Sequence, residues 1–219
     1  MQIIDFIKLI IRPNGKRHFL MLLSPDASLL DVGCGNNSPY NIKKILPKCK
    51  YTGVDIGEYE QTKTILADQY ILTRPLNFAT TINNLQIKYD AIISSHNIEH
   101  CYEREKTLMS ILNKVKNGGQ IFLSFPCQQS IHFPKRRGTL NYYDDPTHRD
   151  KPPSFEYIID QLVKNEFKVE YSSRNYKPIV LRIVGFFLEP FSRLQNKVLW
   201  GTWEFYGFES IIIGRKKGI

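Results

Sequence analysis

A short apolar run that ends in two closely spaced glycines constrains this chain more than any other stretch. Residues 29–32 read Leu-Leu-Asp-Val, and Gly33 and Gly35 follow at once. The run predicts a buried strand, and the glycines let the backbone turn sharply toward a ligand without a Cβ atom in the way. A second strand, 51–55, ends in Asp55, 20 residues after Gly35, where an acid suits the two hydroxyls of a ribose. Together the two strands predict a site for an adenosine-type cofactor.

The residues after the glycine pair argue against two other nucleotide loops. The dinucleotide fingerprint needs a third glycine where this chain has Ser38, which disfavours a nicotinamide dehydrogenase. No GxxxxGKS or GxxxxGKT loop for a triphosphate occurs in the sequence. Asn37 tolerates left-handed backbone angles better than most residues, so the turn can keep its shape. By itself, the glycine pair is also compatible with a tight turn that binds nothing.

Two further motifs extend the pattern. Residues 89–100 read Tyr-Asp-Ala-Ile-Ile-Ser-Ser-His-Asn-Ile-Glu-His, a strand that opens into a polar turn, and Gly118-Gly119 precede Ile-Phe-Leu-Ser at 121–124. In this order the four motifs resemble the class I S-adenosylmethionine-dependent methyltransferases, from about residue 29 to residue 126. The resemblance implies an α/β, Rossmann-like class I methyltransferase fold: a mostly parallel seven-stranded sheet with helices on both faces and an antiparallel last strand. It also implies methyl transfer as the activity and S-adenosylmethionine as the cofactor.

The resemblance places the cofactor at the ends of the first strands. For the adenine edge, Asn77 competes with Asp68 and is preferred because it lies 13 residues before Asp90. Glu99 and His100 resemble a pair that opens a helix in this family, and we expect their role to be structural. The residues expected to contact the cofactor are Asp31, Gly33, Gly35, Asn37, Asp55, Asn77, Phe78, Ser95 and His96.

The segment 127–153 is long, polar and rich in Gly and Pro. Long loops of this kind are usually functional or disordered, and its aromatic, Asp and His residues argue against disorder. Its Asp-Asp-Pro-Thr-His stretch resembles methyltransferases of bacterial surface-polysaccharide (O-antigen and capsule) gene clusters. That resemblance implies O-methylation of a sugar hydroxyl in polysaccharide biosynthesis, with 127–153 as the substrate loop.

A hydroxyl is a poor nucleophile until a positioned His or Asp removes its proton. We therefore expect His132, His148 and Asp145 to be catalytic. The same loop holds two His and two Asp within 17 residues, which could also bind a divalent cation or merely order the loop; we assign no metal. The residues expected to contact the acceptor are Tyr142, Tyr143, Asp144 and Arg149.

The remaining segments predict one domain over residues 1–219. Residues 1–23 are expected to form a helical cover over the cofactor cleft or to pack on the sheet edge. Residues 178–206 are expected to form a helical insertion before the last strand, in which Pro190 should kink or split the helix. The apolar positions of this insertion fit a packed element, and they also fit a surface that contacts the inner membrane leaflet or a second subunit.

Composition sets outer bounds on partners and location. The chain has 30 basic and 21 acidic residues, a formal charge of +9, which permits an anionic partner but does not require one. Its four cysteines form no CxxC pair, which is typical of reduced thiols in a cytoplasmic protein. We expect a cytoplasmic enzyme that acts on a small molecule or on a nucleotide- or lipid-linked glycan. Peripheral contact with the inner membrane and a homodimer are both compatible with the sequence. Methylation of RNA or another small molecule, and a non-catalytic partner subunit, are the alternatives; nucleic acid is disfavoured because no aromatic-basic RNA module is appended.

Overall fold

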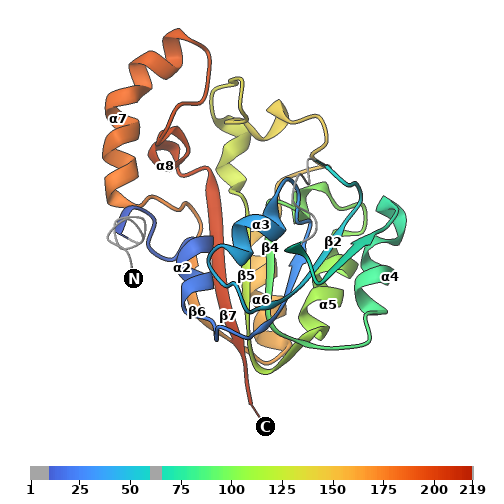
Figure 1. The fold of residues 1–219 in the computed structure, drawn as a ribbon. Coiled ribbons are helices and arrows are strands. Elements are labelled where there is room, and N and C mark those ends of the chain that lie inside the picture. The colour runs from blue at the N-terminus through green and yellow to red at the C-terminus, as the bar shows by residue number, and fades with distance from the viewer. Residues whose placement is uncertain (1–9, 60–65, 219) are drawn as a thin grey trace.

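A seven-stranded sheet with helices on both faces forms the body of the protein (Figure 1). The computed structural model describes residues 10–59 and 66–218. The strand order is β3-β2-β1-β4-β5-β7-β6, and β7 runs antiparallel to both β5 and β6. The fold expected from the sequence, with an antiparallel last strand, is confirmed. The strands are β1 Ser28–Val32, β2 Lys50–Asp55, β3 Gln69–Leu72, β4 Tyr89–Ser95, β5 Val115–Pro126, β6 Phe167–Ser173 and β7 Glu209–Lys216.

Two layers of helices bury the two faces of the sheet. α2 (Lys16–Met21) and α3 (Ser38–Lys43) cover one face, where they pack on alternate residues of the central strands. α4 (Phe78–Asn83), α5 (Arg104–Asn113) and α6 (Phe155–Lys164) cover the other. Parallel strands covered on both faces are buried along their whole length. All five residues of β1 are accordingly buried, although Ser28 and Asp31 are polar.

Within residues 10–23 the N-terminal segment is helical at residues 10–11 and 16–21. α2 packs Phe19 against Phe122 of β5, with ring centroids 5.6 Å apart, and Lys16 reaches the hydroxyl of Ser38 at the start of α3. The expectation of a helical cover over residues 1–23 falls partly on residues 1–9, which lie outside the described residues. The four cysteines are all buried and form no disulfide.

The insertion between β6 and β7 forms two helices that project beyond the sheet (Figure 1). α7 spans Ile179–Leu194 and α8 spans Thr202–Tyr206. Of the two effects expected of Pro190, a kink or a split, the split does not occur, because α7 continues through the proline. Proline removes one N–H and so frees the carbonyl of Phe186; Phe186 is exposed, so water can replace that bond. No helix among the described residues combines the length and apolar composition needed to cross a bilayer.

α7 and α8 meet backbone to backbone at a pair of glycines. A Cβ atom on Gly185 would overlap the carbonyl oxygen of Gly201, and one on Gly201 would lie 2.6 Å from the Gly185 nitrogen. Gly201 also has φ +79°, in the left-handed region that glycine tolerates best. The angle between the two helices therefore depends on the absence of side chains at both positions.

Replacing Gly185 by alanine should destabilise the protein. The added Cβ must displace backbone atoms rather than a flexible side chain, so we expect a loss of about 3 kcal/mol, the upper part of the range for overpacking. Chemical denaturation followed by circular dichroism measures the free energy of unfolding. Gly218→Ala is the control, because a Cβ there meets nothing within 4 Å; equal stability of the two variants would contradict the close contact.

Candidate active site

The turn after β1 has the left-handed geometry that its residues predict. Gly33, Gly35 and Asn37 have φ of 70°, 60° and 52°, so the expectation that Asn37 tolerates this region is confirmed. A Cβ on Gly33 would overlap the side chain of Asn97, whereas one on Gly35 would meet nothing within 4 Å. Gly33 therefore allows the loops after β1 and β4 to touch, and Gly35 leaves open space beside the turn.

Asp55, the last residue of β2, holds this turn in place. One carboxylate oxygen accepts a hydrogen bond from the backbone N–H of Gly35, and the other accepts one from Ile56, each at 2.7 Å. Burial raises the pKa of Asp55, although both backbone donors work in the opposite direction. The thiol of Cys34 also lies within hydrogen-bonding reach of this carboxylate. Because Asp55 lines the cavity, its carboxylate is placed to accept hydrogen bonds from the hydroxyls of a ribose.

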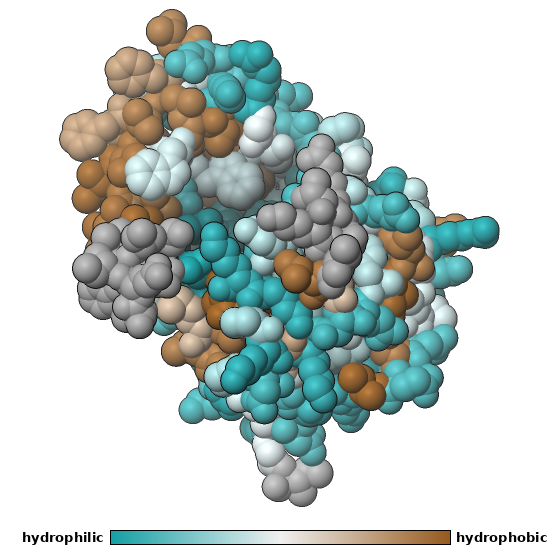
Figure 2. Space-filling model, viewed as in Figure 1, coloured by the Kyte–Doolittle hydropathy of each residue, from teal (hydrophilic) through white to brown (hydrophobic). Residues whose placement is uncertain are grey.

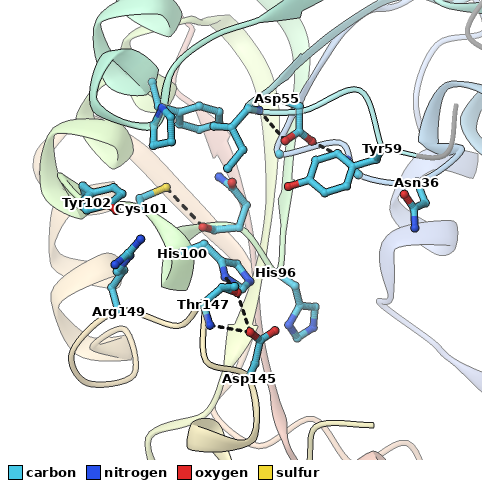
Figure 3. A pocket seen from close by; sticks show the side chains of 16 residues that line it. Asn36, Asp55, Tyr59, His96, His100, Cys101, Tyr102, Asp145, Thr147 and Arg149 are labelled. Carbon is cyan, nitrogen blue, oxygen red and sulfur yellow. Dashed lines mark hydrogen bonds between the residues drawn. The ribbon is translucent and has the colours of Figure 1, made fainter.

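One cavity of about 480 Å³ extends from this turn to the loop after β5, a volume typical of small-molecule sites. Gly35, Asp55 and Phe78 line what we call the donor end, and His100 and Asp145 line the acceptor end. Figure 3 shows Asp55 and Tyr59 on one wall, with His100, Thr147 and Asp145 gathered on another. The cavity thus joins an adenosine-type site to a second, polar region.

Only some of the residues expected to contact the cofactor line the cavity. The expected residues that line it are Gly33, Gly35, Asp55, Phe78 and His96. Asn77 is exposed beside Phe78 and does not line it. Its competitor Asp68 binds Lys43 Nζ at 2.6 Å and the N–H of Tyr51 at 2.7 Å. The hydroxyl of Ser95 pairs with that of Ser124.

Asp31 lies behind the turn rather than on the cavity wall. Its buried carboxylate accepts hydrogen bonds from the hydroxyls of Ser38 at 2.5 Å and Tyr51 at 2.9 Å. It thereby ties the start of α3 to β2, the two elements that flank the turn. Asp31 and Asn37 are not among the cavity-lining residues, and their contribution there is to the shape of the turn.

His96 sits between two buried acids. Its ring nitrogens lie 3.1 Å from Glu99 Oε1 and 3.2 Å from Glu209 Oε1. Burial opposes the charged imidazole, but the hydrogen bonds with Glu209 and Glu99 outweigh it and raise the pKa of His96 to about 10. Arg12 donates to the other oxygen of Glu209 at 2.6 Å. Sequence reasoning missed Glu209 and Arg12, because no local pattern links residues so far apart in the chain.

The substrate loop is ordered largely by its own residues. The carboxylate of Asp144 accepts three backbone N–H groups, from Arg136, Leu140 and Asn141. Tyr142 is fully buried, and its single hydroxyl proton is shared between the carbonyl oxygens of Arg149 at 2.8 Å and Lys151 at 3.2 Å. Two of the four residues expected to contact the acceptor are thus engaged in the structure of the loop.

The other expected loop residues are divided between the surface and the cavity. His132 is exposed on the short helix η4 (Gln128–His132), and Tyr143 is exposed on η5 (Tyr142–Asp144). Neither lines the cavity, whereas Asp145 and Arg149 do. The guanidinium of Arg149 lies 3.8 Å above the ring of Tyr102. The structure therefore separates His132 from Asp145, which the sequence grouped together.

His148 joins two residues from the turn after β4. Its ring stacks on Tyr142 and lies 4.8 Å from the ring of His100. Glu99 completes a group in which one ligand atom from each residue lies within 4.8 Å of the others, close enough that the three could hold a metal ion. His100 Nδ1 lies 2.9 Å from the hydroxyl of Thr147. Sequence reasoning treated Glu99 and His100 as structural, and the Glu-His pair was the only signal that could have found them.

Comparison with known proteins decides the family. A model of the methyltransferase domain family matches residues 8–171. The chain belongs to this methyltransferase family. S-adenosylmethionine is accordingly its cofactor, and the donor end fits it through the open space at Gly35 and the carboxylate of Asp55 on the cavity wall. When bound, it supplies a methyl group on a positively charged sulfur.

The relatives span several organisms. An uncharacterized protein of Methanocaldococcus jannaschii is 35% identical over 103 residues, which cover 44% of this chain and 27% of the relative. The match thus spans about a quarter of that relative's length. A methyltransferase from Archaeoglobus fulgidus has the same fold, with a TM-score of 0.54, 19% identity and coverage of 98% of this chain and 100% of its own. A Haloferax volcanii protein, solved in complex with a methyltransferase activator, aligns with a TM-score of 0.62, 13% identity and coverage of 97% and 93%.

Removing the Asp55 carboxylate should weaken cofactor binding. Asp55→Ala loses hydrogen bonds to both ribose hydroxyls and to the Gly35 turn, so we expect Kd to rise about 30-fold, or about 2 kcal/mol. Isothermal titration with S-adenosylmethionine and S-adenosylhomocysteine measures the change. Asp68→Ala is the control: Asp68 also accepts a backbone N–H beside β2 but lies outside the cavity. Equal losses in both variants would show a general effect on the sheet edge instead.

Proposed function

We propose that the protein transfers a methyl group from S-adenosylmethionine to a sugar hydroxyl in bacterial surface-polysaccharide synthesis. The observation that carries this proposal is the acceptor end of the cavity. There His100, Asp145, Thr147 and Arg149 line the wall, and Glu99 and His148 lie next to His100. These groups can orient a polyhydroxylated acceptor and take up the proton of its hydroxyl. The Asp-Asp-Pro-Thr-His stretch at 144–148 supports the choice of a glycan.

Methyl transfer requires this end of the cavity to align the acceptor and to allow removal of its proton. The acceptor oxygen must form a bond to the methyl carbon while the bond from sulfur to that carbon breaks and sulfur keeps the electron pair. The protein contributes mainly alignment and removal of the hydroxyl proton. Because the leaving sulfur becomes neutral, no residue has to stabilise a leaving anion.

The charges at the acceptor end fit a hydroxyl acceptor. Burial works against ionisation of Asp145, but hydrogen bonds from Thr147 outweigh it and hold the pKa of Asp145 below its ordinary value. Burial also lowers the pKa of His148, so this imidazole is neutral near pH 7. A carboxylate can bind sugar hydroxyls, a neutral imidazole can accept a proton or a cation, and Arg149 can bind the phosphate of a nucleotide- or lipid-linked sugar.

The two histidines of the loop should differ in their importance. His148→Ala should lower kcat by about 10²- to 10⁴-fold, the usual range for loss of proton transfer. His132→Ala should leave kcat within about twofold, because His132 is exposed and does not belong to the group of Glu99, His100 and His148. Transfer of labelled methyl to a panel of nucleotide-diphosphate sugars and lipid-linked saccharides measures both, with S-adenosylhomocysteine affinity as the test of folding. A large loss in His132→Ala would contradict the assignment.

Two alternatives predict different outcomes of the same assay. Labelled methyl in RNA, together with steeply salt-dependent RNA binding, would favour an RNA methyltransferase. Cofactor binding without transfer to any acceptor would favour a partner subunit, and the Haloferax volcanii relative is itself found with an activator. Methyl transfer to a sugar hydroxyl, mapped by NMR of the product, supports the proposal.

An exposed apolar surface on the insertion supports a lipid-linked acceptor. Figure 2 shows apolar residues gathered over α7, and such contiguous patches mark interaction sites. The exposed charges of α7 are Arg182 and Arg193, since its single acid, Glu189, pairs with Arg136 at 2.6 Å. An apolar face with a basic border suits an anionic membrane surface. The exposed apolar residues are Ile179, Val180, Ile183, Phe186, Phe187, Phe191, Leu194 and, beyond α7, Trp200.

Vesicle sedimentation tests this surface. We expect the protein to sediment with vesicles of phosphatidylglycerol and phosphatidylethanolamine, and Phe187→Ser with Phe191→Ser to weaken binding more than tenfold, because each buried ring contributes about 1.5–3 kcal/mol. Leu22→Ser is the control, since Leu22 is equally exposed but lies after α2. The protein could instead fail to bind vesicles and form a dimer in light scattering that the double variant does not form. That result would assign the surface to a second copy of the chain.

A further inference from the structure

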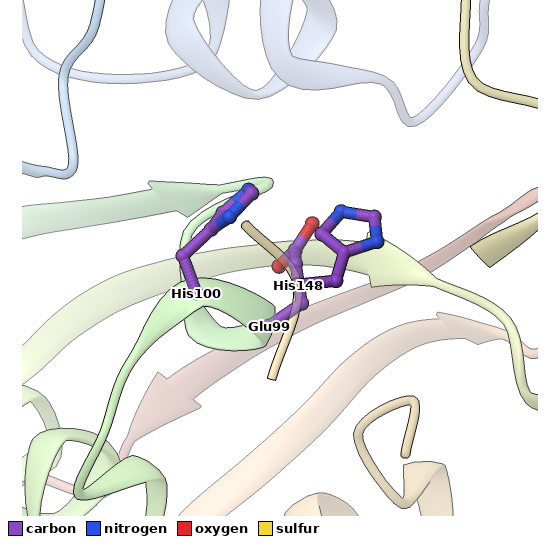
Figure 4. A group of neighbouring side chains, drawn as sticks. All are labelled: Glu99, His100 and His148. Carbon is purple, nitrogen blue, oxygen red and sulfur yellow. The ribbon is translucent and has the colours of Figure 1, made fainter. Parts of the chain in front are cut away.

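A group of three side chains beside the acceptor end could hold a metal ion, and one of them, His100, lines the cavity. Glu99 and His100 lie on the short helix η3 (Ile98–His100) after β4, and His148 comes from the substrate loop. Their three ligand atoms lie within 4.8 Å of one another. Figure 4 shows the carboxylate of Glu99 and the two imidazole rings gathered in one place. Two imidazoles and one carboxylate are a common ligand set for divalent transition metals.

Hydrogen bonds fix both imidazoles in the tautomer that a metal needs. The Nδ1 of His148 lies 2.5 Å from the carbonyl oxygen of Tyr142, and a carbonyl can only accept, so Nδ1 carries the proton. The hydroxyl of Thr147 donates to Asp145 Oδ1 at 2.6 Å, so it must accept from His100 Nδ1. Both Nε2 atoms are therefore left with a lone pair. Metal-binding histidines typically have this arrangement, with the other N–H held by a carbonyl, carboxylate or hydroxyl.

The carboxylate of Glu99 gives independent evidence for a cation site in this group. The residue is fully buried. Its Oε1 contacts His96, but Oε2 has no hydrogen-bond partner among the described residues. A buried carboxylate oxygen without a partner is unfavourable by about 1–3 kcal/mol or more. A cation bound beside His100 and His148 would satisfy it.

We propose that Glu99, His100 and His148 bind one divalent first-row transition-metal cation at the acceptor end of the cavity. Asp145 offers a further oxygen, since its Oδ2 lies 4.0 Å from His148 Nε2. Imidazole ligands suit later transition metals such as Fe²⁺, Co²⁺ and Zn²⁺ better than Mg²⁺ and Ca²⁺, which prefer all-oxygen sites. His132, which the sequence placed with His148, does not belong to this group.

The position of the group suggests what the cation does, and this step rests on the proposed O-methylation. His100 and Asp145 line the cavity at the end opposite Asp55, where the acceptor would bind. A cation there binds the acceptor hydroxyl and makes its proton more acidic, and the proton passes to water in the open cavity. The oxygen then forms its bond to the methyl carbon as sulfur leaves with the electron pair. In this scheme His148 holds the cation instead of taking up the proton itself, so the loss of kcat expected in His148→Ala would follow from loss of the cation.

Spectroscopy of the full chain tests the site without a methyl acceptor. After removal of metal with EDTA, Co²⁺ should bind in a ratio of one per chain and develop visible absorption bands typical of nitrogen and oxygen ligands. Glu99→Gln, His100→Ala and His148→Ala should each weaken Co²⁺ binding at least tenfold. His132→Ala is the matched control, because it removes an exposed imidazole of the same loop and should bind Co²⁺ normally. Retained affinity for S-adenosylhomocysteine shows that each variant is folded.

Two results would overturn the site: no Co²⁺ or Mn²⁺ binding to the wild type at millimolar concentration, or unchanged binding in His100→Ala and His148→Ala. A third would overturn only the catalytic role, namely methyl transfer that is insensitive to EDTA. Supporting results are stoichiometric Co²⁺ binding lost in the three variants, and methyl transfer that EDTA abolishes and Mn²⁺ restores. Binding of Co²⁺ without transfer to any sugar would support the site while counting against the proposed function, so the two can fail separately.

Discussion

The site depends on the convergence of the parallel strands at one edge of the sheet. In the order β3-β2-β1-β4-β5-β7-β6 the connections diverge between β1 and β4, and α/β sheets open a crevice at such a point. The turn after β1, Asp55 at the end of β2 and the turn after β4 all meet there. The contact between Gly33 and Asn97 is so close that no side chain fits at position 33. The close approach of Gly33 to Asn97 thus fixes the turn after β1 against the turn after β4.

A buried charge network couples the acceptor end to distant parts of the chain. His96 bridges Glu99 and Glu209, and Arg12 pairs with Glu209 and lies 3.6 Å from Glu204 of α8. Burial favours protonated Glu209, but its hydrogen bond with His96 outweighs this and lowers its pKa. Because an unpaired buried charge is far more unfavourable than a paired one, these residues hold one another in place. The orientation of Glu99 is therefore set by β7 and the N-terminal segment as well as by its own turn.

The substrate loop shows where reasoning from sequence reaches its limit. His132 and His148 are equivalent in the sequence, as two histidines in one polar loop, yet one is exposed and the other stacks on buried Tyr142. Asp144 and Asp145 are adjacent, yet Asp144 binds three N–H groups of the loop and Asp145 faces the cavity. Local residue types state which chemistry is available. Residue types do not tell which of two like residues accepts hydrogen bonds from the loop backbone and which faces the cavity. Hydrogen bonds within loops do not repeat at a regular spacing along the sequence, unlike those of helices and strands.

The sequence by itself determined the sheet, the glycine turn after β1 and the acid at the end of β2. Each of these is a local signal: an apolar run, a glycine pair with left-handed backbone and an acid at a strand end. Only the tertiary structure decided the acceptor end, where η3 and the loop bring Glu99, His100 and His148 within 4.8 Å of one another. It also decided that α7 continues through Pro190. The physical reason is the same in both cases. Such features depend on contacts between segments distant in sequence and on solvent exposure, and neither is encoded in local composition.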